Sequence, residues 1–349
     1  MKKKNKKKIW LIISSIVIVA IIAIGVCAKF YYHYTVSNFT SRDGKSHTYY
    51  IYPNTSVAQL LKKIEKDYQI NSETAWRIHC HHLQFEKIKP GHYELPAKIS
   101  NRALILRFQQ GQETPIKLSF NQSLRKNEQV AAHMGNKLLL DSAEVASRMN
   151  DPVYMEKYGL NKATALCLFI PNTYEVYWGM SVDQLFERMH KEYERFWNSE
   201  RLGKASKLGL NPVEVATLAS IVASESNNTA EQPLIASLYI NRIKKGMLLQ
   251  ADPTVVYAND DFTIRRVLKK HLEKDSPYNT YKYKGLPPGP IRLTNTTVLD
   301  AVLNAPSSDY LYMCANPDFS GTHVFTSTYS KHLEVARQYQ RELNKRKIK

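Results

Sequence analysis

Glu225 is the side chain in this sequence with the clearest potential for acid–base chemistry. It continues an apolar stripe at helical spacing that includes Val215, Leu218 and Val222, so the next position of that stripe carries a carboxyl group. Burial disfavours the charged form of a carboxyl, and the negative end of a helix dipole acts in the same direction. A glutamate with a raised pKa can serve as a general acid near neutral pH. The same pattern also fits a glutamate at a frayed helix end, turned to solvent.

The helix that must position Glu225 has a well-marked start and a plausible end. Asn211 is a good cap, Pro212 suits the first helical position, and Glu214 can complete a capping box. Ser226 and the two asparagines after it favour turn and cap geometry, so the helix should end near residue 225. A second helix is predicted over residues 231–245.

Two segments further along the chain have clear local signals. The charged stretch 260–275 is predicted to be a solvated helical insert. Pro287, Pro288 and Pro290 flank a single glycine, which predicts a stiff extended loop. Such a loop would make a rigid wall for a cleft that holds a flexible polymer.

Four separated motifs occur in a fixed order: LASIVASES, INRIKKGMLLQADPTVVYA, YNTYKYKGLPPGPI and GTHVF. Together they resemble the MltG (YceG-like) family of endolytic murein transglycosylases, and the resemblance is strongest from Leu210 to His332. It implies that Glu225, followed by Ser226, is the catalytic acid. Many family members carry a second glutamate where this chain has Ala223, so a helper role for that carboxylate is not expected here.

The resemblance also implies which side chains contact substrate. The implied substrate-binding residues are Ser226, Asn241, Gln250, Asp252, Thr254, Tyr257, Asn279, Tyr281, Pro287 and Pro288. For some of these positions the residues alone also allow a structural role. Asp252 can cap a turn. Arg242, beside Asn241, could hold a carboxylate or a backbone carbonyl, and a structural salt bridge is the favoured expectation. Tyr174 and Tyr177 could line a sugar cleft or be ordinary core and rim residues.

The activity implied by the resemblance is cleavage of the bond between N-acetylmuramic acid and N-acetylglucosamine. Glu225 would act first as acid and then as base, closing a 1,6-anhydro ring and ending the elongation of nascent strands without any metal or organic cofactor. Two alternatives stay open. One is a muramidase-like hydrolase in which Asp252 or Glu231 activates water. The other is a non-catalytic glycan-binding scaffold of the wall-synthesis complex.

The N-terminus predicts export and anchoring. Six lysines in residues 1–8 form a basic cytoplasmic tail, and the uncharged residues 9–28 are long enough to span a membrane of about 30 Å. A cleaved signal peptide is the alternative. We expect a single-pass protein of the plasma (inner) membrane, with its N-terminus cytoplasmic and everything from Lys29 onward outside.

The external part is expected to have a mixed α+β fold. Residues 29–46 are predicted to be a spacer, residues 47–115 a small α+β module resembling a degenerate LysM domain, and residues 116–349 the transglycosylase domain with a lysozyme-like catalytic helix. A LysM-like module implies glycan binding, whereas a plain α+β spacer would only hold the catalytic domain off the membrane. The histidines at 79, 81 and 82 lack a nearby acid at ligand spacing, so no metal site is expected.

The formal net charge of +18 favours an anionic partner. Export makes nucleic acid an unlikely one, so membrane headgroups or wall polymers fit better. The expected partners are therefore peptidoglycan strands and peptidoglycan synthases at the membrane. Three cysteines lie outside the span, namely Cys80, Cys167 and Cys314, and an odd number at scattered positions does not indicate a disulfide framework or a metal site. Buried thiols are expected, with one disulfide as the alternative.

Overall fold

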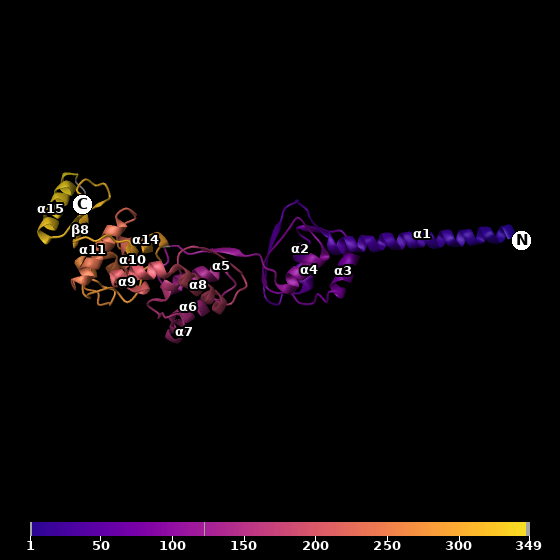
Figure 1. The fold of residues 1–349 in the computed structure, drawn as a ribbon, viewed down its shortest axis with the longest axis horizontal. Coiled ribbons are helices and arrows are strands. Elements are labelled where there is room, and N and C mark those ends of the chain that lie inside the picture. Colours follow the sequence, from indigo (N-terminus) through magenta and orange to yellow (C-terminus); the bar gives the residue numbers. More distant parts are fainter. Residues whose placement is uncertain (1, 122, 347–349) are drawn as a thin grey trace. The chain divides into compact units, whose positions relative to one another are not determined.

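The structure is a computed structural model that describes residues 2–121 and 123–346 (Figure 1). Helices and short strands both contribute, so the fold is of the mixed α+β type that the sequence predicts. The chain forms two units. Unit 1 comprises Met1–Ile116 and Glu175–Gly179, and unit 2 comprises Lys117–Tyr174 and Met180–Lys349. Glu225 belongs to unit 2.

The first helix, α1 (Lys2–Thr35), contains the predicted membrane span. Over Lys7–Thr35 its most apolar window has a mean hydropathy of 3.0. Among the described residues it is the one helix that is long and apolar enough to cross a membrane, and a signal sequence near the N-terminus would have the same length and composition.

The last turns of α1 pack against unit 1, on α3 (Glu73–His82) and α4 (Asn101–Gln110). The Tyr34 ring lies 4.8 Å from the His79 ring, and His33 is buried with its Nδ1 2.8 Å from the Ser37 carbonyl. The structure therefore differs from the predicted spacer at residues 29–46. Apolar and aromatic side chains here find a packing surface, so the helix continues, and Phe39 begins a buried strand.

The remainder of unit 1 consists of two small antiparallel sheets and three helices. In the three-stranded sheet β1 (Phe39–Ser41) lies between β3 (Tyr68–Ile70) and β5 (Lys98–Ile99), and in the second sheet β2 (His47–Ile51) pairs with β4 (Gly91–Leu95). Besides α3 and α4, this part of unit 1 contains the helix α2 (Val57–Ile64), which begins with a capping box between Ser56 and Gln59. Residues 175–179 return to this unit through Trp178, whose ring lies 5.1 Å from the rings of both Tyr50 and Tyr52.

The first half of unit 2 is mostly helical. It contains β6 (Ile116–Ser119), α5 (Asn127–Lys137), α6 (Ser142–Asn150), α7 (Pro152–Glu156), the 3₁₀ helix η1 (Ala165–Leu168), β7 (Thr173–Val176) and α8 (Val182–Phe196). Strands β6 and β7 pair with each other, and each also includes residues assigned to unit 1. The predicted cap of α8 is confirmed, because Ser181 and Gln184 form a capping box.

The second half of unit 2 carries the Glu225 helix. It contains α9 (Ser199–Leu208), α10 (Pro212–Glu225), α11 (Gln232–Lys244), α12 (Asp252–Asn259), α13 (Lys269–Leu272), α14 (Thr296–Leu303), β8 (Tyr312–Ala315), β9 (His323–Thr326) and α15 (Tyr329–Lys345). The prediction of a helix over residues 260–275 is wrong except for the single turn of α13. Arg265 and Lys269, like Arg266 and Lys270, would be like-charge pairs four residues apart, which destabilise a helix.

Helix α10 lies at the centre of the hydrophobic core in this half of unit 2. It packs against α9, α11 and α14, which are labelled around it in Figure 1, and against α12. Its side chains Val215, Leu218, Ile221 and Val222 are fully buried. The buried Ser220 hydroxyl donates to the Thr217 carbonyl and accepts a hydrogen bond from the Ile291 amide at 3.0 Å. Packing on several sides and this tie to the loop after Pro290 hold the end of α10, and therefore Glu225, in a fixed place.

Candidate active site

The local signals that predict the Glu225 helix are confirmed. The Asn211 side chain accepts a hydrogen bond from the Glu214 amide at 2.9 Å, and the Glu214 carboxylate accepts one from the Asn211 amide at 2.8 Å. Pro212 is the first helical residue and Glu225 is the last, with Ser226 as the C-cap. Glu225 thus lies at the negative end of the helix dipole, where a protonated carboxyl is favoured.

The Glu225 carboxyl is partly buried and has one close polar partner. The Tyr239 hydroxyl, on α11, donates to Glu225 Oε1 at 2.7 Å. Desolvation raises the pKa of Glu225 from 4.5 to about 7 and is the largest influence on it. The hydrogen bond from Tyr239 lowers this pKa, the negative charge of Asp252 raises it, and Arg242 lowers it. At neutral pH a large fraction of Glu225 is therefore protonated, as a general acid requires.

Tyr239 and Arg242 come from one face of α11, three residues apart. Burial raises the pKa of Tyr239 well above its usual range, so its hydroxyl stays a neutral donor. Arg242 is buried and donates to the Leu311 carbonyl at 2.6 Å and to the Leu249 carbonyl at 2.7 Å. Arg242 therefore binds backbone carbonyls, which is the alternative to the favoured salt bridge, and it fixes the chain before Asp252.

Asp252 is the second carboxylate close to Glu225. It is the first residue of α12, is exposed, and accepts a hydrogen bond from the Tyr281 hydroxyl at 2.6 Å. Gln250, two residues earlier, has a positive φ of 49° and an exposed side chain, and its amide donates to the Thr280 carbonyl. The structure thus places Asp252 and Tyr281 together beside Glu225, with Gln250 on the same loop.

Ser226 and Glu231 join the end of α10 to the His323 loop. The Ser226 hydroxyl accepts from the Asn228 amide and donates to Glu231 Oε2 at 3.4 Å. The Glu231 carboxylate also accepts from the His323 amide at 2.6 Å, and its Oε2 lies 3.2 Å from His323 Nδ1. Both oxygens of this buried carboxylate are therefore occupied by the fold.

Other residues of the predicted substrate-binding set hold the loops in place. Thr254 is fully buried and its hydroxyl donates to the Ala251 carbonyl, and the fully buried Asn279 side chain donates to the Leu272 and Lys274 carbonyls. Asn241 donates to the carbonyls of Ser308 and Tyr310. The polar atoms of these three side chains already bond to backbone carbonyls of the protein. Their contact with a substrate stays a prediction.

The remaining predicted residues lie in varied surroundings. Pro287 is buried and Pro288 is exposed. The Tyr257 ring lies 4.6 Å from the Tyr278 ring. Tyr174 is buried and donates to the Ile170 carbonyl, as a core residue does, whereas Tyr177 is exposed and belongs to unit 1.

Tyr239 is the member of the site that sequence reasoning missed. Its signal was available: it lies among the apolar residues of α11, and a buried tyrosine hydroxyl usually needs a polar partner. What the sequence does not show is that α11 crosses α10 at the level of Glu225. No group of three or more metal-binding side chains occurs among residues 2–121 and 123–346.

Comparisons with known proteins agree with these motifs. The chain is 29% identical over 304 residues to an endolytic murein transglycosylase of Bacillus subtilis (strain 168), a match that covers 82% of this chain and 82% of that protein. It is 22% identical to an endolytic murein transglycosylase of Streptococcus pneumoniae serotype 2, over 95% of this chain and 66% of that protein.

A solved structure and a family model extend the comparison to the fold. The crystal structure of a YceG-like protein from Listeria monocytogenes matches with a TM-score of 0.55 and 28% identity, covering 83% of this chain and 99% of that one. The model of the YceG-like family matches residues 49–338. Because that match spans most of the sequence, this chain belongs to the YceG-like family.

Proposed function

We propose that this protein is an endolytic lytic transglycosylase of peptidoglycan, with Glu225 as its catalytic group. The names of its relatives support the substrate and the reaction class. The observation that carries the proposal is the partly buried carboxyl of Glu225, with a pKa of about 7, held by the neutral Tyr239 hydroxyl.

One carboxyl can perform both proton transfers of this reaction. Protonated Glu225 gives its proton to the glycosidic oxygen between N-acetylmuramic acid and N-acetylglucosamine, and that bond breaks. The acetamido group of the substrate stabilises the cationic carbon. Ionised Glu225 then takes the proton of the C6 hydroxyl, whose oxygen closes the 1,6-anhydro ring. A pKa near the working pH serves both steps, since neither protonation state is strongly disfavoured.

The hydrogen bond from Tyr239 orients Glu225 for this work. It engages Oε1, and no hydrogen bond to Oε2 occurs among the described residues, so Oε2 is the oxygen available to the substrate. Tyr239 is in turn fixed by burial. The catalytic carboxyl is therefore aimed by its neighbour and does not depend on the substrate for its orientation.

Asp252 supports a second candidate function, a muramidase-like hydrolase. It is an exposed carboxylate whose charge acts on Glu225, so it has the position of a group that could activate water. Glu231 is a weaker candidate for that role, because His323 and Ser226 occupy both of its oxygens.

We propose further that α1 anchors the protein with its N-terminus in the cytoplasm, on the basis of the lysines that precede the apolar span. We also propose that the module in unit 1 is LysM-like and binds glycan. A cavity of about 350 Å³ between the Tyr52–Thr55 turn and Lys62, Lys63 and Lys66 supports this role. Association with peptidoglycan synthases remains a prediction from family resemblance.

The test uses the full chain in detergent micelles, because the end of α1 packs against unit 1. Uncrosslinked glycan strands are incubated with the wild type, Glu225→Gln and Asp252→Asn, and the products are analysed by mass. Anhydro-ended fragments that disappear only with Glu225→Gln would support the transglycosylase. Fragments heavier by one water, lost with Asp252→Asn, would support the hydrolase. Binding without cleavage by any variant would support a scaffold and refute both enzymes.

A further inference from the structure

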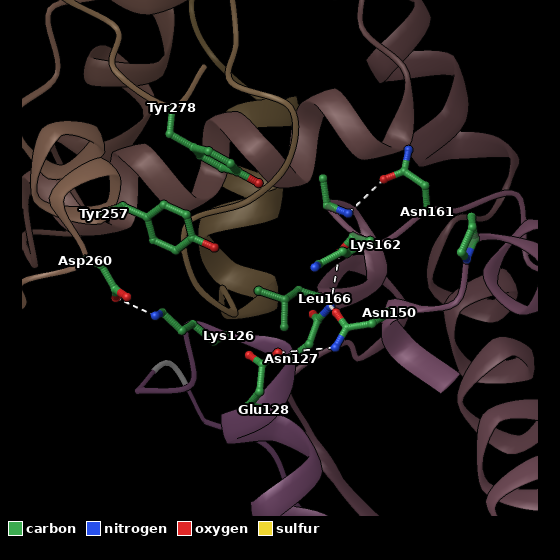
Figure 2. Close-up of a pocket in the computed structure, with 12 residues that line it drawn as sticks. Lys126, Asn127, Glu128, Asn150, Asn161, Lys162, Leu166, Tyr257, Asp260 and Tyr278 are labelled. Atoms are coloured by element: carbon green, nitrogen blue, oxygen red, sulfur yellow. Dashed lines mark hydrogen bonds and ion pairs between the residues drawn. The ribbon is translucent and has the colours of Figure 1, made fainter. Parts of the chain in front are cut away.

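Unit 2 contains a cavity of about 620 Å³ that includes Tyr257 of the predicted substrate-binding set but none of the groups next to the Glu225 carboxyl (Figure 2). One wall is formed by the start of α5 and the end of α6, a second by the turn at residues 161–166, and a third by Tyr257 and Tyr278. Neither Glu225 nor any of its four close partners, Tyr239, Arg242, Asp252 and Tyr281, is among the residues that line it. The volume lies within the usual range for sites of small organic ligands.

The aromatic wall offers flat apolar surface with neutral hydroxyls. The rings of Tyr257 and Tyr278 lie 4.6 Å apart at 46°, and Figure 2 shows both hydroxyls directed toward the open space. Burial raises the pKa of both tyrosines, so the hydroxyls stay protonated. Leu166 and Ala163 also line the cavity and add apolar surface to it. Ring faces with adjacent hydroxyls suit the C–H face of a pyranose and its hydroxyl groups.

The polar wall is built and held together by amides. Asn127 is buried and its side chain donates to Asn150 Oδ1 and to the Lys162 carbonyl, both at 3.1 Å, so it joins two walls. Asn150 donates to Glu128 Oε1 at 3.2 Å. An ion pair between Lys126 and Asp260 connects α5 to the end of α12. The cavity is therefore a consequence of specific contacts between three segments.

The charges around the cavity decide between classes of ligand. Lys126 and Lys162 contribute two positive charges, and Glu128 and Asp260 contribute two negative ones. Such a balanced lining gives no net attraction for a polyanion or for a strongly charged peptide. A neutral ligand with apolar faces, hydroxyls and amide groups fits the lining better.

We propose that this cavity is a second glycan-binding site that holds N-acetylhexosamine units of the strand outside the catalytic cleft. The proposal rests on the proposed function for the identity of the polymer. Helix α12 connects the two places: Asp252 at its start lies beside Glu225, and Tyr257, about 7.5 Å further along the helix axis, lines the cavity. One strand can therefore contact both sites, which favours cleavage within long strands over trimming of short ones.

The first experiment detects binding at the cavity without requiring catalysis. The full chain with Glu225→Gln carries a photo-crosslinking amino acid in place of Glu128, which lies at the rim, and is irradiated with a soluble β-1,4-linked oligomer of N-acetylglucosamine. Lys137, exposed on the same helix and absent from the lining, is the matched control position. We expect cross-linking from position 128 and not from position 137.

The second experiment uses variants of the cavity in the otherwise wild-type chain. Tyr278→Leu removes a ring face, and Lys162→Ala removes an exposed amine with no ion pair in the part of the chain that the structure describes. In Tyr278→Leu the ratio of kcat/KM for long strands to that for short oligosaccharides should fall about fivefold, the size expected when one stacking contact is lost. In Lys162→Ala the same ratio should fall by a comparable factor, because one hydrogen-bond donor to the sugar is lost. Tyr283→Leu and Lys137→Ala, outside the cavity, should keep the wild-type ratio.

The outcomes separate this proposal from the proposed function. Equal cross-linking at positions 128 and 137, or a ratio unchanged by both cavity variants, would overturn the second site. If the oligomer does not cross-link at position 128, and an anionic wall polymer or a stem peptide irradiated in a parallel sample does, the choice of ligand would be overturned. Cross-linking at position 128, together with an otherwise wild-type chain that cleaves no glycan strands, would support the site while refuting the transglycosylase.

Discussion

Removal of the Tyr239 hydroxyl should move the alkaline limb of the pH–rate profile to higher pH. In the folded protein this hydroxyl donates to Glu225 Oε1 at 2.7 Å and lowers the pKa of that carboxyl. A hydrogen bond donated to a carboxylate stabilises its charged form, so its loss makes the proton harder to remove. Tyr239→Phe keeps the buried ring and deletes only this donor.

The expected displacement follows from the strength of the hydrogen bond. A hydrogen bond to a charged group is worth about 1.5–3 kcal/mol, and about 1.4 kcal/mol corresponds to one pKa unit. Glu225 is partly accessible, so water can replace some of the lost interaction and the lower value applies. The pKa of Glu225 should therefore rise from about 7 to about 8.

The measurement is kcat/KM for anhydro-end formation by the full chain across the neutral range, which reports the pKa of the free enzyme. Because Glu225 must be protonated for bond cleavage, wild-type kcat/KM should fall as the pH rises through about 7. In Tyr239→Phe the fall should occur about one unit higher. Tyr193→Phe, a tyrosine packed against the same core, serves as the control. A Tyr239→Phe limb that stays near pH 7, or moves lower, would refute this account of the site.

Further predictions concern charge and stability around the same helix. Asp252→Asn removes a negative charge that raises the pKa of Glu225, so the alkaline limb should move to lower pH in the same assay. Because the pKa of Glu225 rises on folding from 4.5 to about 7, its ionisation costs stability as the pH rises through this range. At pH 8 the free energy of unfolding of Glu225→Gln should therefore exceed that of the wild type by up to about 3 kcal/mol, and by less after allowance for the partial exposure of the side chain. Thermal unfolding should show this gain at pH 8 and no gain at pH 4. Glu231→Ala should cost about 1–3 kcal/mol, because it leaves the donors of the adjoining loop unpaired; a thermal unfolding midpoint equal to that of the wild type would contradict this. Arg201→Lys loses the two hydrogen bonds to the Asp300 carboxylate and should lower the free energy of unfolding by about 1 kcal/mol. A destabilisation that is larger at high salt than at low salt would argue against an ion pair.

The parts of the site that depend on nearby sequence were predictable. The capping box of Asn211 and Glu214 fixes the start of α10, and the apolar spacing then places Glu225 on a buried face near its end. Both signals act within a few residues of the chain, so the sequence carries them almost directly.

The parts that depend on tertiary contacts were not predictable in this way. The contact between Tyr239 and Glu225 joins two helices, and their crossing is set by packing. Thr254 and Asn279 have side chains typical of sugar-binding loops, yet the fold buries them and uses their hydrogen bonds internally. Polar residues of one type serve either purpose, and only burial and partners distinguish the two.

The unbroken passage of α1 into unit 1 has a mechanical consequence. The helix is about 51 Å long, and if residues 9–28 fill a hydrocarbon layer of about 30 Å, its last turns act as a stiff lever outside the bilayer. A helix whose apolar length exceeds the local membrane thickness tilts to accommodate it. Because Phe30 and Tyr34 pack on His79 of α3, and the end of α1 also contacts α4, such a tilt would turn the rest of unit 1 by the same angle. Membrane thickness would then set the direction in which unit 1 faces, a dependence that a flexible Gly/Ser tether would abolish.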